Sequence, residues 1–193
     1  MTGRTHDLAA ITLLTAVIVM TPLPAISLAT AILAVLANQI GGILPDIDQP
    51  IAPFWRNLPI GGPIGRAFTK LLGGHRFLTH SLVGIVVIFF LAYDLLVFLQ
   101  PIMPHVNIDL VWGAFVVGVV SHLIMDMFTK EGVPWLLPLP IKFGIPPIKH
   151  LRIVTGKKME MFIVFPFLAL VWVGICLSNY QQLLTLLHAH VVK

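Results

Sequence analysis

The sequence predicts an all-α protein, a polytopic bundle of about five transmembrane helices with two long loops at one face of the membrane. Of the 193 residues, 58% are hydrophobic and 10% are charged, whereas about a quarter of the residues in a typical soluble domain are charged. The apolar residues are gathered in runs close to the length that a helix needs to cross a bilayer. The charged residues lie mostly between these runs, so we expect one integral membrane domain over residues 1–193.

Five apolar runs are long enough for spanning helices. They cover residues 6–22, 26–44, 78–99, 108–128 and 159–178. A signal peptide is an alternative for the first and shortest run, but no soluble domain follows it. The connections "TPLP" (21–24) and "QPIMPHVN" (100–107) are short and rich in proline, which ends helices. The connections 45–77 and 129–158 are long, and such loops are usually functional.

Two shorter helices are expected outside the spans. One is an amphipathic helix at the membrane surface, formed by Phe68, Leu71 and Leu72 with Arg66 and Lys70. The other is a surface helix in the tail from Gln181 to His190.

The basic residues predict the orientation in the membrane. All twelve Lys and Arg residues except Lys193 fall on the side of the two long loops. By the positive-inside rule that side is cytoplasmic, which places the N-terminus inside and the C-terminus in the periplasm. Topology therefore accounts for the net charge of +4. Basic stripes interleaved with aromatic residues are absent, so no nucleic-acid partner is expected. The single cysteine, Cys176, lies in an apolar run and is interpreted as a packing residue.

Rare polar residues fall at this same predicted face, at the ends of all five spans. They are His6, Asp46, Asp48, His75, His80, His122, Asp126 and Glu160. Taken one at a time, each is explained as a hydrogen-bonded structural group, and "DID" as a helix stop. As a set they favour function, because ionisable groups within spans are costly. The remaining histidines lack an acidic neighbour, and Asp94 and Asp109 are interpreted as interfacial residues.

These residue types are typical of a metal site. His122 and Asp126 are four residues apart and therefore lie on one face of a helix, whose C-terminal end favours a cation. Imidazole nitrogens mixed with carboxylate oxygens suit zinc, manganese or iron better than calcium or magnesium, and zinc is favoured. The candidates exceed the three protein ligands of one catalytic zinc. One to three ions are expected, and two ions bridged by an aspartate are one arrangement.

Several motifs resemble a known family. "LPDIDQP", "GHRFLTHS" and "SHLIMDMFTKEGVPWLLPLP", with "GRTHDLAA" and "KKMEMF", resemble the YdjM-like (LexA-regulated) bacterial inner-membrane metal-dependent hydrolases over residues 3–165. The resemblance implies an inner-membrane protein. It maps a ligand set onto His6, Asp46, Asp48, His75, His80, His122 and Asp126, with Glu160 as a further candidate. The chain is more distantly similar to zinc-dependent phospholipase C and P1-type nucleases, which share a His-x-x-x-Asp pair like His122 and Asp126.

The hypothesis that follows is a membrane-embedded phosphoesterase acting on a phospholipid or another lipid-linked phosphate at the cytoplasmic leaflet. Arg76 is the candidate for a bidentate contact to phosphate, and Arg152 and Lys157 are candidates for gathering anionic headgroups. Thr79 and Ser81 are either donors that orient the ligands or caps of the following helix. Glu160 is a metal ligand or a general base.

Two other function classes stay open. A metal-dependent amidase or peptidase is less favoured because the H-E-x-x-H motif is absent. A metal transporter or a metal-stabilised scaffold is less favoured because the candidates gather at one face, whereas a transport path needs polar residues across the bilayer.

Overall fold

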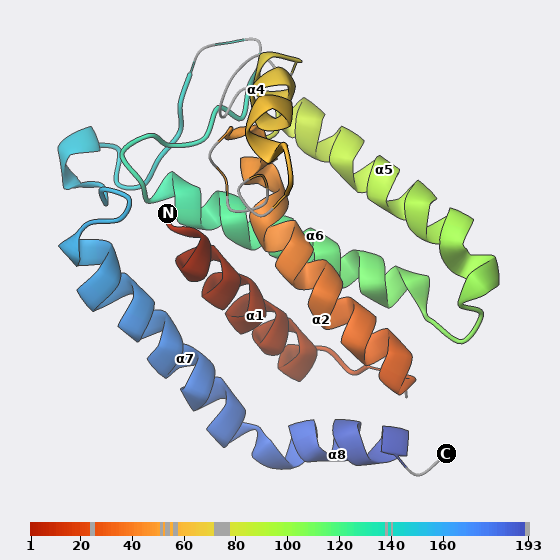
Figure 1. Cartoon of the computed structure of the whole chain (residues 1–193). Helices are drawn as coiled ribbons and strands as arrows, with labels where there is room; N and C mark the ends of the chain where they lie inside the picture. The colour runs from red at the N-terminus through yellow and green to blue at the C-terminus, as the bar shows by residue number, and fades with distance from the viewer. Residues whose placement is uncertain are drawn as a thin grey trace.

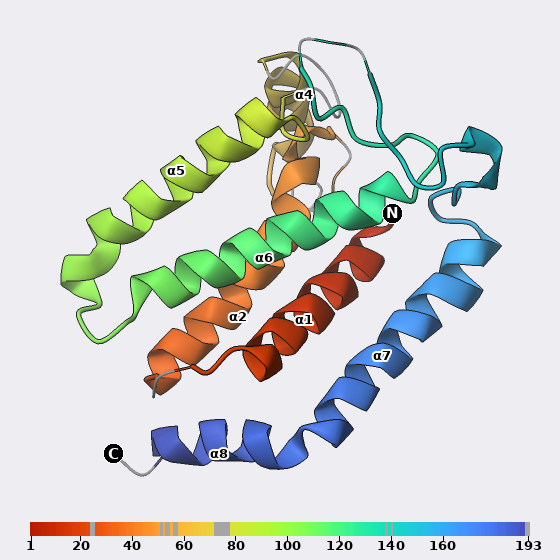
Figure 2. The same ribbon diagram turned by 180° about the vertical axis from the view of Figure 1, so that it is seen from behind.

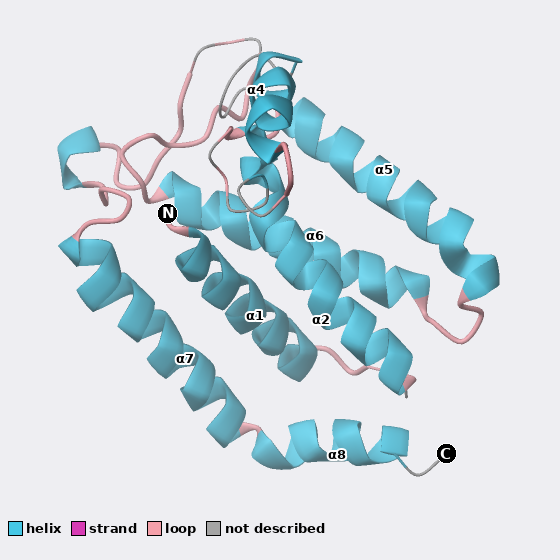
Figure 3. Ribbon diagram, viewed as in Figure 1, coloured by secondary structure: helices cyan, strands magenta, loops and turns pink. Residues whose placement is uncertain are grey.

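A computed structural model describes residues 1–23, 26–50, 52, 55, 58–71, 78–137, 139 and 141–191, with side chains described up to residue 186. Seven α-helices and several shorter helical turns make up the regular structure of this part of the chain. Figure 3 shows helices joined by loops, and β-pairing among the described residues is limited to two isolated bridges. The all-α prediction is confirmed.

Five helices provide the predicted spans. They are α1 (Gly3–Met20), α2 (Leu28–Ile43), α5 (Leu82–Leu99), α6 (Ile108–Met127) and α7 (Phe165–Ser178). With adjoining short turns, they form candidate spans Gly3–Met20, Leu28–Asp48, Leu82–Ile102, Ile108–Met127 and Glu160–Ser178. The number and order of spans match the prediction. The third helix begins later than expected, because the Ser81 hydroxyl caps α5 by accepting a hydrogen bond from the Gly84 N–H at 3.1 Å.

Helices α1, α2 and α6 form the inner part of the bundle, with α5 beside α6 and α7 beside α1 (Figures 1 and 2). Burial follows this order: 56% of the α6 span is buried inside the protein, against 11% of the α5 span and none of the α7 span. The outer helices expose large apolar side chains, such as Phe90 on α5 and Leu170 on α7. Such surfaces suit contact with lipid acyl chains.

Glycines hold α2 and α6 together at very short range. A Cβ added at Gly41 would overlap the carbonyl of Phe115, and a Cβ added at Gly118 would overlap the carbonyl of Asn38. The Asn38 side chain donates a hydrogen bond of 3.0 Å to the carbonyl of Ala114. Small residues allow spanning helices to approach this closely, and a polar bond then fixes their register. The position of α2 against α6 is therefore well determined.

Both predicted shorter helices are present. The loop 45–77 contains α4 (Gly61–Leu71), which covers the proposed amphipathic segment except Leu72, a residue outside the described part of the chain. The tail forms α8 (Tyr180–Val191), whose Gln182 side chain donates to the carbonyl of Val19 at the end of α1. Both elements are confirmed as helices, and their depth in a membrane stays a prediction.

The remaining connections contain short turns. A 3-10 turn, η1 (Leu44–Asp48), continues α2, and η2 (Gln100–Ile102) follows α5. The connection between α6 and α7 contains η3 (Lys149–Leu151) and ends in a π-helical turn, η4 (Glu160–Val164), that leads into α7. Within it, bridges pair Thr129 with Ile153 and Val133 with Phe143.

Five helix ends lie on the same side of the bundle. They are the N-terminal ends of α1, α5 and α7 and the C-terminal ends of α2 and α6, all in the upper part of Figure 1. The expected polar residues that the structure describes lie at or next to these ends, namely His6, Asp46, Asp48, His80, His122, Asp126 and Glu160. Which side of the membrane this is remains a prediction from the basic residues.

Candidate metal centre

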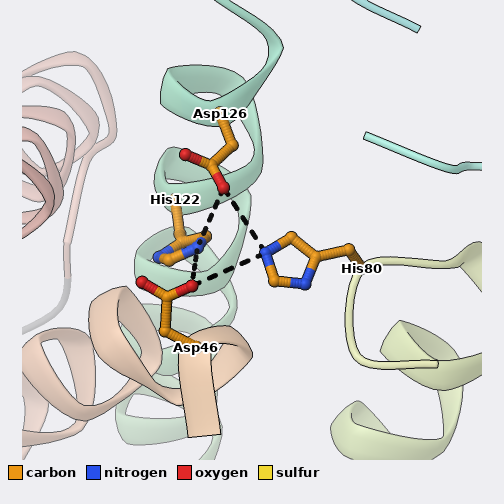
Figure 4. Close-up of side chains that lie close together, drawn as sticks. All are labelled: Asp46, His80, His122 and Asp126. Carbon is orange, nitrogen blue, oxygen red and sulfur yellow. Dashed lines mark ion pairs between the residues drawn. The ribbon is translucent and has the colours of Figure 1, made fainter. Parts of the chain in front are cut away.

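Four of the predicted ligands come together. One ligand atom from each of Asp46, His80, His122 and Asp126 lies within 4.8 Å of the ligand atoms of the other three. We call these residues the four-residue group. Asp46 lies in η1, His80 lies in the turn just before α5, and the other two lie one turn apart on α6 (Figure 4). Three separate segments therefore contribute to one site.

The atoms of the group alternate between nitrogen and oxygen around a common centre (Figure 4). His80 Nε2 lies 3.5 Å from Asp126 Oδ2 and 4.0 Å from Asp46 Oδ1, and His122 Nε2 lies 3.6 and 3.8 Å from the same two oxygens. These separations are longer than ordinary hydrogen bonds. They are close to the distance of about 3.4 Å between two ligands of a tetrahedral zinc ion, given bonds of about 2.1 Å.

The contact between α2 and α6 orients His122. Its Nδ1 lies 2.7 Å from the carbonyl oxygen of Gly42, so Nδ1 carries the proton and donates it. This leaves the lone pair on Nε2, which points into the group. Gly42 lies in the last turn of α2, where backbone carbonyls lack partners within the helix. A hydrogen bond from the second ring nitrogen is the usual way in which a protein fixes a metal-binding histidine.

A short chain of hydrogen bonds orients His80. The Thr79 hydroxyl lies 2.5 Å from Asp48 Oδ2 and 2.9 Å from His80 Nδ1. An ionised carboxylate can only accept, so Thr79 donates to Asp48 and accepts the proton of His80 Nδ1. The Nε2 lone pair of His80 then faces Asp46 and Asp126. Burial lowers the pKa of His80, which lies outside the candidate span, and so favours the neutral imidazole that binds metals.

Asp46 forms the accessible edge of the group. Its side chain is 19% exposed, whereas the side chains of the other three residues are fully buried. The turn that carries it is held by Trp55, whose indole N–H donates to the carbonyl of Ile47 at 2.8 Å. The hydroxyl of Thr69 on α4 donates to the carbonyl of Asp48 at 2.7 Å. Both bonds fix the backbone of η1 directly after Asp46.

Asp126 connects the group to the N-terminal helix. Its Oδ2 faces His80 and His122, while its Oδ1 lies 3.4 Å from His6 Nε2 and 2.6 Å from the Met1 amino nitrogen. The His6 ring stacks on the His122 ring, with centroids 3.8 Å apart and planes inclined by 13°. His6 is therefore brought beside the four-residue group, on the other oxygen of Asp126.

The residues present fit a divalent cation. His122 Nε2 and Asp46 Oδ1 are buried and make no hydrogen bond within the described part of the chain. Leaving such atoms unsatisfied costs about 1–3 kcal/mol each, and a cation at the common centre would remove that cost. Two imidazole nitrogens with two carboxylate oxygens match the preferences of zinc, manganese and iron.

A comparison with known protein families identifies the family of this chain. Residues 1–183 match the family described as "YdjM inner membrane protein". The chain belongs to this family. It is therefore an inner membrane protein, and it has five candidate spans among the described residues.

Three curated relatives are similar to the chain. The "Uncharacterized protein YvsG" of Bacillus subtilis is 27% identical over 164 residues, which cover 85% of this chain and 88% of the relative. The "Inner membrane protein YdjM" of Escherichia coli is 34% identical over 122 residues, which cover 63% of this chain and 56% of the relative. The Shigella flexneri protein of the same name matches equally. No solved structure matches the chain.

The structure places Asp48 and Glu160 outside the four-residue group. Asp48 Oδ2 lies 3.9 Å from His80 Nδ1 and accepts a hydrogen bond from the Thr79 hydroxyl, so it is on the side of the His80 ring away from the group. The Glu160 carboxylate accepts hydrogen bonds of 2.6–2.8 Å from the backbone and hydroxyl of Thr2, the hydroxyl of Thr5 and the N–H of Gly156. Glu160 thus ties the start of α7 to the start of α1. Its expected role as a ligand or general base stays a prediction.

Of the three expected phosphate-binding residues, the structure describes Arg152 and Lys157. The Arg152 guanidinium donates to the carbonyls of Gly144, Pro146 and Pro147 at 2.7–3.1 Å, so it supports its own loop. Lys157 is exposed near the start of α7. His75 and Arg76 lie outside the described residues, and their predicted roles are untested.

Sequence reasoning overlooked the groups that position the ligands. The Gly42 carbonyl and the Asn38 amide belong to no recognised motif, and Thr2 and Thr5, which bind Glu160, lie beside and within "GRTHDLAA", where His6 was the expected site residue. One available signal was the pair Gly41 and Gly42 at the end of an apolar run, because adjacent glycines often mark a close approach of two backbones. A second was Asn38, a buried amide within a span.

Proposed function

We propose that this YdjM-family protein is a metal-dependent hydrolase embedded in the membrane, and that it is a phosphoesterase acting on a phospholipid or lipid-linked phosphate at the cytoplasmic leaflet. The observation that carries the proposal is the four-residue group itself. Two histidines, each held by a hydrogen bond at Nδ1, direct Nε2 toward two carboxylates at one end of the spans. A site of this composition at the end of spanning helices suits a substrate that lies in the membrane surface.

The chain's own residues have separate tasks in this proposal. His80, His122, Asp46 and Asp126 would hold the metal. A bound divalent metal supplies a water of lowered pKa and neutralises phosphoryl oxygens. Thr79 and the Gly42 carbonyl keep the two imidazoles in the required tautomer. Burial of three of the four residues limits water at the site and leaves the Asp46 edge as the approach for a substrate.

The surface near Asp46 supports a lipid substrate. Helix α4 contacts η1, and Thr69 on α4 bonds to the turn that carries Asp46 (Figure 1). On its outer side α4 exposes Ile64, Phe68 and Leu71 together with the basic side chains of Arg66 and Lys70. A helix of this kind lies readily in the interface and attracts anionic headgroups. A lipid phosphate drawn to α4 would lie close to the Asp46 edge.

The test combines metal analysis with a lipid screen. The full chain is purified in detergent, its metal content is measured by mass spectrometry, and a panel of phospholipids is followed for hydrolysis products. The variant Asp46→Asn keeps the shape of the side chain but removes its charge. Asp94→Asn removes a charge from an exposed position on α5, outside the group, and is the matched control.

The proposal expects bound metal and phosphate-ester cleavage in the wild type and in Asp94→Asn, and the loss of both in Asp46→Asn. A folded wild type that takes up no divalent metal would exclude the hydrolase. Bound metal with no cleavage of any phosphate lipid would turn the interpretation toward a scaffold or transporter. Cleavage of amide bonds in place of phosphate esters would identify an amidase or peptidase.

A further inference from the structure

Two cavities lie beside the N-terminal part of α6, at the end of this helix opposite to the one that carries His122 and Asp126. One is an apolar groove of about 650 Å³ between α5 and α6, lined by residues that include Phe89, Phe90, Tyr93, Trp112, Gly113 and Asp109. The other is a pocket of about 340 Å³ at the loop between the helices, with Gln100, His105 and Asn107 in its lining. Asp109 lines both. The two spaces therefore adjoin at one carboxylate.

The aromatic side chains of the groove are held in place around Asp109. The indole N–H of Trp112 donates to the carbonyl of Phe89 at 3.0 Å. The rings of Phe89 and Tyr93 meet the Trp112 ring edge to face, at centroid distances of 6.3 and 5.7 Å. The Tyr93 hydroxyl lies 3.4 Å from Asp109 Oδ1. A carboxylate bordered by fixed aromatic rings is suited to an ammonium group, which both attract.

The two spaces match the two parts of a lipid. The groove lies along spans whose surroundings in a membrane are acyl chains, and its volume falls within the range of about 300–1,000 Å³ typical of ligand pockets. The adjoining pocket is lined by polar side chains from the loop. Among the described residues that line either space, Asp109 is the one with a formal charge, and neither lining includes Lys or Arg. The charge of the site therefore complements a cationic group.

We propose that this α5–α6 groove binds a membrane lipid with an ammonium headgroup. One acyl chain lies against Phe89 and Phe90, and the ammonium lies at Asp109 beside Tyr93 and Trp112. The α6 residues of the site lie in the first turns of the helix, whereas His122 and Asp126 lie in its last turns. This lipid is bound as a ligand and is not the hydrolysed substrate, so the inference does not depend on the proposed hydrolase.

The experiment is native mass spectrometry of the full chain, released from detergent micelles that contain equal amounts of phosphatidylethanolamine and phosphatidylglycerol with identical acyl chains. The first lipid carries an ammonium and the second does not. We expect phosphatidylethanolamine to be retained about fivefold over phosphatidylglycerol, the ratio that an ammonium–aromatic contact of about 1 kcal/mol gives. Equal retention of the two lipids would overturn the proposal.

Two pairs of variants locate the binding. Asp109→Asn is expected to bring the retention ratio close to one, whereas Asp94→Asn, which removes a charge outside the groove, leaves the ratio unchanged. Gly113→Phe fills the groove, because a Cβ at Gly113 meets nothing within 4 Å and the ring can occupy that space. It is expected to reduce the retention of both lipids. Gly174→Phe on α7, where a Cβ also meets nothing within 4 Å, is the control for added bulk.

The same mass spectra would also show the results that contradict the proposal. An equal loss of preference in Asp94→Asn would attribute the preference to general surface charge. Undiminished retention in Gly113→Phe would place the lipid elsewhere. A dimer that carries no lipid would show that a second copy of the chain covers the groove. Each of these results would overturn the proposal, and the metal content and lipid cleavage of the protein would be unaffected by them.

Discussion

Helix α6 carries a carboxylate near each end, and the surroundings of the two differ. Asp109 lies in the first turn, where the partial positive charge of the helix stabilises an anion. Asp126 lies in the last turn, where the helix carries partial negative charge. Asp109 is exposed and contacts a tyrosine hydroxyl, whereas Asp126 is fully buried beside three histidines and the Met1 amine.

The difference shows which of the two acids depends on other segments of the fold. An exposed acid at the start of a helix is stable without help from other segments. A buried acid at the end of a helix requires positive charge or a metal from elsewhere, and α1 and the turn before α5 bring histidines to it. Close contact between α2 and α6 at Gly118 makes this possible, whereas α5 and α6 leave a groove between them beside Gly113.

The largest expected effect comes from breaking that contact. Gly118→Leu would force a side chain into the backbone of α2 at Asn38, and overpacking of this kind costs about 3 kcal/mol or more. We expect a clear fall in thermal stability in detergent together with loss of bound metal. A Cβ at Gly113 on the same helix meets nothing within 4 Å, so Gly113→Leu is expected to keep both. Similar stability of the two variants would show that the α2–α6 contact is looser than described.

Neutralising the two ends of α6 tests the comparison directly. Asp126→Asn removes a proposed ligand, so we expect its affinity for zinc to fall by at least about 100-fold, more than the 10–100-fold typical of residues behind the ligands. Asp109→Asn is expected to leave zinc affinity unchanged. Competition with a chelator of known affinity measures both. Equal affinities in the two variants would remove Asp126 from the site.

The hydrogen-bond chain behind His80 predicts a smaller effect. Thr79→Val removes the hydroxyl between Asp48 and His80, and we expect zinc affinity to fall about 10–100-fold. Thr79→Ser should restore it. Ser81→Ala removes the cap of α5 and is expected to cost about 1 kcal/mol of stability without changing zinc affinity. An unchanged affinity in Thr79→Val would mean that His80 is held by packing alone.

Substitution of Glu160 has the smallest expected effect. It tests whether this residue is a metal ligand, a role that the sequence left open. Its carboxylate accepts three hydrogen bonds from Thr2 and Thr5 at the start of α1 and a fourth from Gly156 in its own loop. Glu160→Gln weakens these charge-assisted bonds, so we expect the free energy of unfolding to fall by about 1–2 kcal/mol, with metal content unchanged. Loss of metal at unchanged stability would instead make Glu160 a ligand.

Much of the fold could be predicted, because membrane spans follow from the length of apolar runs. The order of apolar and polar residues also predicted α4 and the helix of the tail. The pairing of two members of the four-residue group could also be predicted from the sequence. The spacing of His122 and Asp126 places them on one face of a helix, independently of the rest of the fold. Helix starts were less certain, since the Ser81 cap moves the start of α5 beyond His80.

The distinction between Asp46 and Asp48 could not be predicted. Both follow the same apolar run, and only the 3-10 turn η1 with the close approach of α2 to α6 directs Asp46 into the group and Asp48 to Thr79. The roles of Arg152 and Glu160 depend in the same way on contacts with segments distant in sequence. Residue type identified the candidates, and long-range packing sorted them.

The most direct test of the central claim is X-ray absorption spectroscopy of the metal in the zinc-loaded chain. If Asp46, His80, His122 and Asp126 hold one ion, the spectrum will show two imidazole ligands and oxygen ligands at about 2.0–2.2 Å, and His122→Ala will remove one imidazole. A zinc ion without imidazole scattering, or a spectrum unchanged by His122→Ala, would contradict the account.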